Sequence, residues 1–350
     1  MTICYFGDYD PGYARSRVLL KGLRENGVEI LECHSDKKGL KLYWELYKKH
    51  KELNGRCDVL IVAQSFHTRL VWLAKLLSDK KIAWDAFYSF YDKYVNESKA
   101  VSRYGIRAAY QWLRERLACG LADLILLDTD EHIKYFIQKF GVNRSKLKRV
   151  LAGADIGREN VRKEKEGAFI ILFYGNYSPL QGAEYIVRAA KILEGSSEIK
   201  FRLIGAGETS IENRKLAEAL GVKNVEFLGR MPYDELVKEI ARADVCLGVF
   251  GNTAKTQRVI PNKVYDAVAL GRPVVTSDTP AIKELFEDRK NILLCRHADS
   301  QDLADKILEL KSNAELRSKI AQGGYELFQR RATPKIIGAN LLKVISEYGK

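Results

Sequence analysis

Cysteine is scarce in this chain of 350 residues, and no two cysteines have the short spacing of a zinc or thiol-redox motif. The six positions are Cys4, Cys33, Cys57, Cys119, Cys246 and Cys295. Several of them lie inside apolar runs, so we expect buried thiols in a reducing compartment.

Long apolar runs are also missing from the sequence. None approaches the roughly 18 residues that a membrane-spanning helix needs. A strand pattern at residues 3–6 leaves no room for the charged and apolar regions of a signal peptide. We therefore expect a cytoplasmic protein, with any membrane contact being peripheral and on the inner face.

The composition is that of a globular protein with a basic surface. Hydrophobic residues make up 46% and charged residues 29%, which indicates neither disorder nor a fibrous repeat, and the length allows two domains. A net charge of +13 implies attraction to polyanions, whether nucleic acid, anionic lipid headgroups or phosphorylated ligands. Charge alone does not choose among these partners.

The first half opens with the strand, turn, helix, strand order of a doubly wound sheet. Its glycines, Gly7 and Gly12, do not match the GxGxxG dinucleotide fingerprint. Arg15 and Arg17 follow the Gly12 turn and could reach a phosphate or an acidic acceptor. The alternative places both arginines on a solvated helix face.

His67 is a second candidate in this half. The apolar strand at residues 58–63 delivers it into a loop, and ligand groups of open α/β sheets collect at the carboxyl ends of strands. The alternative is a hydrogen-bonded loop histidine without a functional role.

Aromatic and cationic residues alternate over residues 84–116. This pattern suits an anionic membrane surface, where aromatic rings lie at headgroup depth and cations meet lipid phosphate. A buried aromatic core with a basic outer face is the alternative, and nucleic-acid binding is the least favoured interpretation.

Asp128 and Asp130 follow another apolar strand and could hold a divalent cation that bridges a nucleotide diphosphate. We favour a different interpretation, in which Thr129 or Asp130 caps a helix over residues 131–140.

The strand and helix alternation restarts in the second half. The highly charged run at residues 158–167 predicts a linker, and alternating strands and helices return from residue 170 onward. We predict a first domain over residues 1–160, a second over 161–332, and a last helix within 333–350. Pro334 suits the first turn of that helix.

Residues 258–285 organise this half. A helix is expected to start at Pro261 or Asn262 and to end at Gly271, before an apolar strand at 273–276. Lys263 and Asp266 lie three apart on one face near the helix N-terminus, where a phosphate can bind. Asp266 would then accept both hydroxyls of a ribose. The alternative is a solvated Lys263–Asp266 ion pair.

The second half closely resembles glycosyltransferase family 4. The shared features, in order over about residues 173–294, are the glycine turns at 175 and 182, a Gly-x-Gly at 205–207, a Gly-x-x-Pro unit within 227–237, an Ala-Asp-Val-x-Leu strand at 243–247, and a Lys-x-x-Asp-Ala helix and strand at 263–275. The resemblance implies an α/β protein of the GT-B fold. Such a protein has two Rossmann-like domains facing a central cleft, and its C-terminal helix crosses back to the first domain.

The resemblance also implies roles for particular residues. Asp266 takes the place of a glutamate that binds the donor ribose, whereas a second family glutamate is replaced by Arg258. The family's arginine and lysine for the donor diphosphate fall near Asn176 and Gln181, where both charges are missing. Lys263, with Arg258 and Lys255, could supply the charge instead.

The implied function is sugar transfer from a nucleotide-sugar to a glycan or lipid-linked acceptor, with retention and with neither metal nor cofactor. The predicted catalytic residues are Lys263, His67 and Arg258. The predicted donor-binding residues are Asp266, Asn262, Gly175, Asn176, Tyr177, Gly205, Gly207 and Arg230. Gly12, Arg15 and Arg17 are predicted on the acceptor side.

Three alternatives remain open at the level of sequence. The first is a related enzyme that epimerises or hydrolyses the nucleotide-sugar without an acceptor. The second is a basic membrane- or RNA-binding protein whose site has decayed, and the third is a metal-dependent transferase that uses Asp128 and Asp130.

Overall fold

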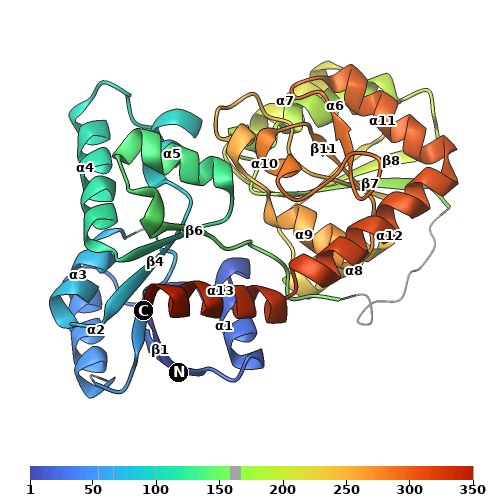
Figure 1. Ribbon diagram of the computed structural model, residues 1–350. Helices are drawn as coiled ribbons and strands as arrows, with labels where there is room; N and C mark the ends of the chain where they lie inside the picture. The colour runs from blue at the N-terminus through green and yellow to red at the C-terminus, as the bar shows by residue number, and fades with distance from the viewer. Residues whose placement is uncertain (54, 66, 99, 158–166, 350) are drawn as a thin grey trace. The chain divides into compact units, whose positions relative to one another are not determined.

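The computed structural model describes residues 1–349 apart from residues 54, 66, 99 and 158–166 (Figure 1). The chain divides into two compact units. Unit 1 comprises Met1–Asp155 with Arg331–Lys350, and unit 2 comprises Ile156–Arg330. The predicted linker falls almost wholly outside the described residues, and so does the predicted boundary at 160/161. The predicted boundary at 332/333 lies two residues beyond Arg330.

Unit 1 is built on a six-stranded parallel sheet with the order β2-β1-β3-β4-β5-β6. Its strands are β1 (Thr2–Gly7), β2 (Glu29–His34), β3 (Val59–Val62), β4 (Lys81–Phe87), β5 (Leu124–Leu127) and β6 (Leu147–Arg149). Its helices are α1 (Ala14–Glu25), α2 (Leu40–Leu53), α3 (Arg69–Leu77), the π-helix η1 (Asp92–Glu97), α4 (Ile106–Leu121), α5 (Asp130–Phe140), the short η2 (Arg144–Lys146) and α13 (Pro334–Gly349).

The strand order fixes which face each helix covers. Parallel strands are joined by right-handed crossovers, so α1 covers one face of the sheet. The later crossovers run in the opposite direction and place α2 to α5 on the other face. Figure 1 shows α2, α3 and α4 along one side of the sheet, with α1 and α13 together on the other. Both faces are therefore covered, which explains the continuous apolar runs of the central strands.

The C-terminal helix α13 belongs to unit 1, as the resemblance implies, and packs closely along α1. The crossing is made by two glycines. A Cβ atom on Gly338 would lie 2.2 Å from the carbonyl carbon of Gly22, and one on Gly22 would lie 2.1 Å from the Pro334 oxygen. The two backbones meet at a distance that no larger residue allows.

Gly338→Ala is therefore expected to destabilise unit 1 by about 1–3 kcal/mol, because the helices must separate. All four tryptophans lie in unit 1, so denaturant unfolding followed by tryptophan emission measures this unit selectively. Gly120→Ala in α4 is the matched control. Its Cβ would meet only the end of the Arg116 side chain, at 3.9 Å, so unchanged or slightly raised stability is expected. Equal effects of the two substitutions would contradict the close crossing.

Unit 2 repeats the architecture with the strand order β12-β11-β10-β7-β8-β9, again all parallel. Its strands are β7 (Phe169–Gly175), β8 (Ile199–Gly205), β9 (Val225–Leu228), β10 (Val245–Leu247), β11 (Val274–Ser277) and β12 (Leu293–Cys295). Its helices are η4 (Pro179–Gln181), α6 (Ala183–Ile192), α7 (Ser210–Ala219), α8 (Tyr233–Arg242), η5 (Thr256–Arg258), α9 (Asn262–Ala269), α10 (Pro280–Lys283), α11 (Ser300–Ser312) and α12 (Ala314–Arg331).

Helix α9 begins and ends as its sequence predicts. Pro261 is its N-cap residue, and Asn262 is its first helical residue. At the other end Gly271 has a positive φ of 63°. Its N–H donates to Val268 O, and the N–H of Arg272 donates to Ala267 O, which is the Schellman pattern. Glycine is favoured at this position because a side chain would strain the left-handed conformation.

The fold expectations are largely confirmed. Two parallel α/β sheets are present, the predicted elements lie within a few residues of the observed ones, and all six cysteines are buried free thiols. Strands β4 and β12 and helices α2, α3 and α10 are additional to the predicted elements. None of the described helices combines the length and the hydropathy needed to cross a bilayer.

Candidate active site

The polar candidates of unit 2 gather where the strand order of its sheet reverses. Strand β7 leads towards β8 on one side and is flanked by β10 on the other, and the carboxyl ends of such a pair are where open α/β sheets bind ligands. The loops that follow β7 and β10 are joined by hydrogen bonds. Phe250 N donates to Gln181 O and Gly251 N donates to Leu180 O, each at 3.1 Å. These two hydrogen bonds hold the two loops together beside the candidate site.

Three predicted donor-binding glycines have a structural reason to be glycine. A Cβ on Gly205 would lie 2.0 Å from Gly175 O, and one on Gly207 would lie 1.6 Å from Asn176 O. A Cβ on Gly175 would lie 2.1 Å from Oε1 of Gln181. These glycines let the turns after β7 and β8 touch each other, and they make room for the Gln181 side chain.

Lys263 lies in the first turn of α9 and is buried beside these loops. Its Nζ donates to Gln181 Oε1 at 3.0 Å and lies 3.8 Å from the centre of the Phe173 ring. Gln181 Nε2 in turn donates to Asn176 Oδ1 at 2.6 Å. Lys263 therefore brings its amine to Gln181, which in turn contacts Asn176, and these are the two positions at which the family charges are missing.

Burial lowers the pKa of Lys263 well below its usual value, because desolvation disfavours the ammonium form. A buried amine of this kind binds its proton weakly until an anion is placed against it. An anionic ligand at this position would raise the pKa again.

Asp266 lies one turn further along α9 and is also buried. It accepts a hydrogen bond from the Tyr174 hydroxyl at 3.0 Å, and that hydroxyl also lies 3.2 Å from Lys263 O. Burial, followed by the charge of Asp266, raises the pKa of Tyr174 well above its usual value. The alternative of a solvated Lys263–Asp266 ion pair is wrong, because the two residues are only 6% and 5% exposed.

The remaining donor-side candidates differ in what they can offer. Asn262 stands at the N-terminus of α9, and Arg258 ends η5 directly before it. Arg230 is exposed and reaches Ala206 O at 3.4 Å. The Tyr177 ring packs edge-on against Phe173 in the core and is 1% exposed, so its predicted role in donor binding falls to the backbone of this residue.

In unit 1 the strand order reverses between β1 and β3, and His67 lies in the loop after β3. Its Nδ1 is 2.5 Å from Oδ2 of Asp8, which directly follows β1. The Asp8 carboxylate thereby orients the imidazole ring of a half-exposed histidine. The other ring nitrogen, Nε2, takes no part in this contact. Gly12 lies in the turn after Asp8, where its N–H donates to Asp10 Oδ1.

The prediction that Arg15 reaches an acceptor is wrong. Its guanidinium is fully buried, pairs with Asp85 through Nε and Nη2, and donates through Nη1 to the carbonyls of Val150 and Leu151. Arg15 therefore joins α1 to β4 and to the chain after β6. Arg17 is partly exposed but is held by both carboxylate oxygens of Asp155.

The prediction that Thr129 or Asp130 caps a helix is confirmed for Thr129, whose Oγ1 accepts the N–H of His132. The two flanking carboxylates have other partners, since Asp128 binds His132 Nδ1 and Asp130 binds Arg149. Across the residues that the structure describes, no group of three or more His, Cys, Asp or Glu side chains is placed to hold a metal ion.

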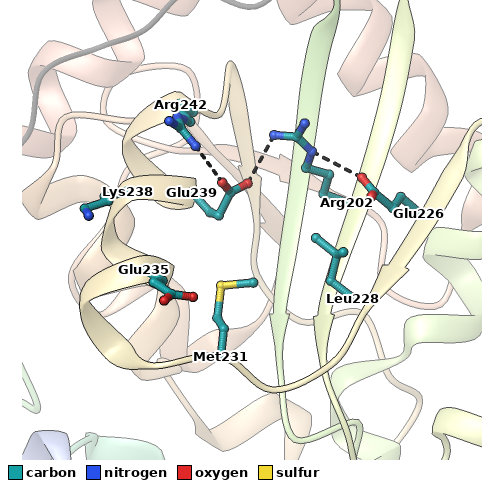
Figure 2. A pocket seen from close by; sticks show the side chains of 8 residues that line it. All are labelled: Arg202, Glu226, Leu228, Met231, Glu235, Lys238, Glu239 and Arg242. Atoms are coloured by element: carbon teal, nitrogen blue, oxygen red, sulfur yellow. Dashed lines mark hydrogen bonds and ion pairs between the residues drawn. The ribbon is translucent and has the colours of Figure 1, made fainter.

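A depression of about 310 Å³ lies between α8, strand β8 and the edge strand β9. Figure 2 shows Glu239 between Arg202 and Arg242, with Arg202 also facing Glu226. The two arginines of this depression are therefore neutralised by neighbouring carboxylates. The depression is therefore a poorer candidate for binding an anion than the surroundings of Lys263.

Two functional candidates are missing from the sequence prediction. The sequence marks Gln181 only as the position where the family's lysine is missing, although it accepts a hydrogen bond from the Lys263 amine. Tyr174 lies within an apolar strand, a context that predicts a core residue. One signal in the sequence does point to Tyr174: it has a polar atom and lies near the carboxyl end of a central parallel strand.

Residues 157–327 match the family model described as glycosyl transferases group 1. A D-inositol 3-phosphate glycosyltransferase of Corynebacterium jeikeium is 28% identical over 225 residues, covering 58% of this chain and 52% of the relative. The chain matches only about half the length of its curated relatives.

Two solved structures share the fold over nearly the whole chain. HepE of Anabaena, crystallised with UDP, has a TM-score of 0.73 at 16% identity and is covered over 100% of its length, with 99% of this chain aligned. Sucrose-phosphate synthase of Thermosynechococcus elongatus has a TM-score of 0.77 at 13% identity, with 99% of this chain and 98% of that one aligned. The GT-B fold is thus confirmed, and the family number 4 stays a prediction. Residues 157–327, just under half of the chain, are thus similar to the family of glycosyl transferases group 1.

Proposed function

We propose that the protein transfers a sugar from a nucleotide-sugar donor to a glycan or lipid-linked acceptor, with retention and without a metal ion. The observation that carries this proposal is the buried amine of Lys263, in the first turn of α9, which donates to Gln181; the same helix also carries Asp266. This group of side chains lies where a sheet of this kind binds ligands.

The comparisons support the proposal in two ways. Several curated relatives are named as glycosyltransferases, and one of them is a phosphatidyl-myo-inositol mannosyltransferase of Mycobacterium leprae. The structural neighbour HepE was crystallised with UDP-glucose as well as with UDP. A nucleoside diphosphate sugar is therefore the donor class to test first.

The chemistry assigns a role to each group. The bond between the anomeric carbon and the diphosphate oxygen breaks, and the acceptor hydroxyl forms the new bond and loses its proton. Negative charge grows on the leaving diphosphate, where a fixed cation and a helix N-terminus stabilise it. Lys263 and the start of α9 supply these groups in this chain. Asp266 binds the ribose hydroxyls, and Arg258 adds charge from η5.

His67 is proposed to contact the sugar, with Asp8 holding its ring. Gly12 and Arg17 remain proposed for the acceptor side, whereas the buried Arg15 is removed from it.

The proposal is tested by analysing products from a panel of UDP- and GDP-sugars in excess chelator, with and without a mixture of glycan and lipid-linked acceptors. We expect nucleoside diphosphate to be released together with a glycosylated product, only when acceptor is present.

Each alternative predicts a different outcome. A changed or hydrolysed sugar without acceptor indicates an epimerase or hydrolase. Activity that chelator abolishes contradicts the metal-independent transfer. Donor that neither binds nor reacts supports the basic binding protein with a decayed site.

A further inference from the structure

Helix α4 of unit 1 carries an apolar stripe on its solvent side. Its buried side consists of Ala108, Glu115, Ala118 and Cys119. The exposed large apolar residues are Ile106, Tyr110, Leu113 and Leu117, which are 43% to 89% exposed. Spacings of four, three and four residues place them along one line of the helix. A helix of a globular protein normally presents polar residues there.

The stripe continues onto the neighbouring helices. Arg69 of α3 donates to the Tyr110 hydroxyl of α4 and also interacts with Tyr43 of α2, so the three helices lie side by side. Leu76 of α3 is 83% exposed, and Trp44 of α2 is 59% exposed. These two residues and the α4 stripe define the basic apolar face. An exposed apolar surface of this kind marks an interaction site.

The charge on the α4 part of this face has one sign. Arg103, Arg107, Arg114 and Arg116 lie on or just before α4, and the one carboxylate between residues 103 and 121, Glu115, points inward. Glu115 accepts hydrogen bonds from Ser89 and from the N–H groups of Phe90 and Tyr91. Helix α2 adds the exposed Lys41, Lys48 and Lys51, together with one exposed carboxylate, Glu52.

Most of the aromatic residues expected to meet a membrane lie elsewhere. Trp84, Phe87, Phe90 and Tyr91 are buried in the core of unit 1, so the expectation that residues 84–116 form one membrane surface is wrong for its first part. The alternative of a buried aromatic core is therefore correct for this first part of the segment only. From residue 103 onward the large exposed apolar side chains are Tyr104, Ile106, Tyr110, Leu113 and Leu117, whereas Trp112 packs against the core.

We propose that the basic apolar face binds the headgroup region of an anionic lipid bilayer. Aliphatic side chains would enter the interface, and the flanking lysines and arginines would meet lipid phosphate. The face would hold unit 1 at a membrane surface, where a lipid-linked acceptor would be found.

Two other occupants fit the residues less well. A second copy of the chain would use the stripe as a helix-to-helix seam, but the positions beside it are Arg107, Ala109, Arg114 and Arg116, so two copies would bring like charges together. Nucleic acid would meet the arginines but has no use for an aliphatic line of Ile106, Leu113 and Leu117.

The test is co-sedimentation of the full chain with vesicles of phosphatidylcholine alone and of equal parts phosphatidylcholine and phosphatidylglycerol. Wild type is expected to bind the anionic vesicles only, and to bind them less as salt rises. The double substitution Ile106→Ser with Leu113→Ser should lower the partition coefficient at least about tenfold, since each removes a side chain buried on binding. Arg103→Glu with Arg107→Glu should lower it by a similar factor.

Ile211→Ser is the matched control. Ile211 is 66% exposed on α7 of unit 2, outside the basic apolar face, so this variant should bind vesicles as the wild type does. The proposal fails if the variants of the face bind as the control does, or if neutral vesicles bind equally well. It also fails if light scattering shows a dimer that Ile106→Ser dissociates, or if the wild type binds a homopolymer RNA and no vesicles. No donor is used, so the result is independent of the proposed transferase activity.

Discussion

Lys263→Met is expected to reduce turnover of the nucleotide-sugar about a thousandfold while the protein stays folded. The substitution removes the amine that lies on Gln181 and keeps most of the side-chain volume. Removing a single preorganised charge-stabilising group costs roughly 10²–10³ in kcat. Because the family charges are missing at positions 176 and 181, few groups remain that could take over from the lysine. We therefore expect a loss of kcat at the upper end of this range. Turnover is measured as nucleoside diphosphate release at saturating donor.

The stability of the same variant separates function from folding. Burial lowers the pKa of Lys263, so at neutral pH the buried amine opposes folding of the ligand-free protein. Replacement by Met removes this cost together with one hydrogen bond to Gln181, so it should not lower the free energy of unfolding by more than about 1.5 kcal/mol. Lys283→Met is the control, because Lys283 of α10 is exposed and pairs with Asp278. Near-normal turnover of Lys263→Met would remove Lys263 from the site.

Arg15→Met is expected to be the most destabilising of the single substitutions considered, at about 3–5 kcal/mol. It leaves Asp85 buried without its partner, and breaking a buried ion pair in this way costs about that amount. The carbonyls of Val150 and Leu151 lose their donor as well. Tryptophan emission during denaturation follows the loss, because the four tryptophans lie in unit 1.

Two further variants show whether the buried pair is the cause. Arg17→Met removes a cation of the same helix that is 24% exposed, so a cost below about 1 kcal/mol is expected. Arg15→Met combined with Asp85→Leu removes both buried charges and should recover part of the loss. A double variant as unstable as Arg15→Met alone would contradict an origin in the unpaired Asp85.

The architecture could be predicted because its signals are local. Pro261 before a helix, Gly271 after it and the apolar strand that follows are read within a few residues of one another, and the structure places α9 and β11 there. The same local signal places Lys263 and Asp266 at the start of one helix. Glycine turns after strands are likewise a local pattern.

The errors involve partners that are distant in the chain. Arg15 and Asp85 are 70 residues apart, and nothing beside Arg15 in the sequence separates a buried guanidinium from a solvated one. Tyr174 meets Asp266 over 92 residues. The outward stripe of α4 has an amphipathic spacing that fits a core-facing helix equally well, so its exposure follows only from knowing which side the sheet covers.

The most direct test of the donor site is calorimetric titration of the chain with UDP, GDP, ADP and CMP in excess chelator, repeated in buffers of different ionisation enthalpy. The lowered pKa of Lys263 means that the free site has lost proton affinity, and a bound diphosphate should restore it. We predict saturable binding of one nucleoside diphosphate with net proton uptake, and an affinity that falls as the pH rises. Lys263→Met should abolish the uptake. Binding of none of the four nucleotides, or binding with no proton uptake that is unchanged in Lys263→Met, would contradict the site.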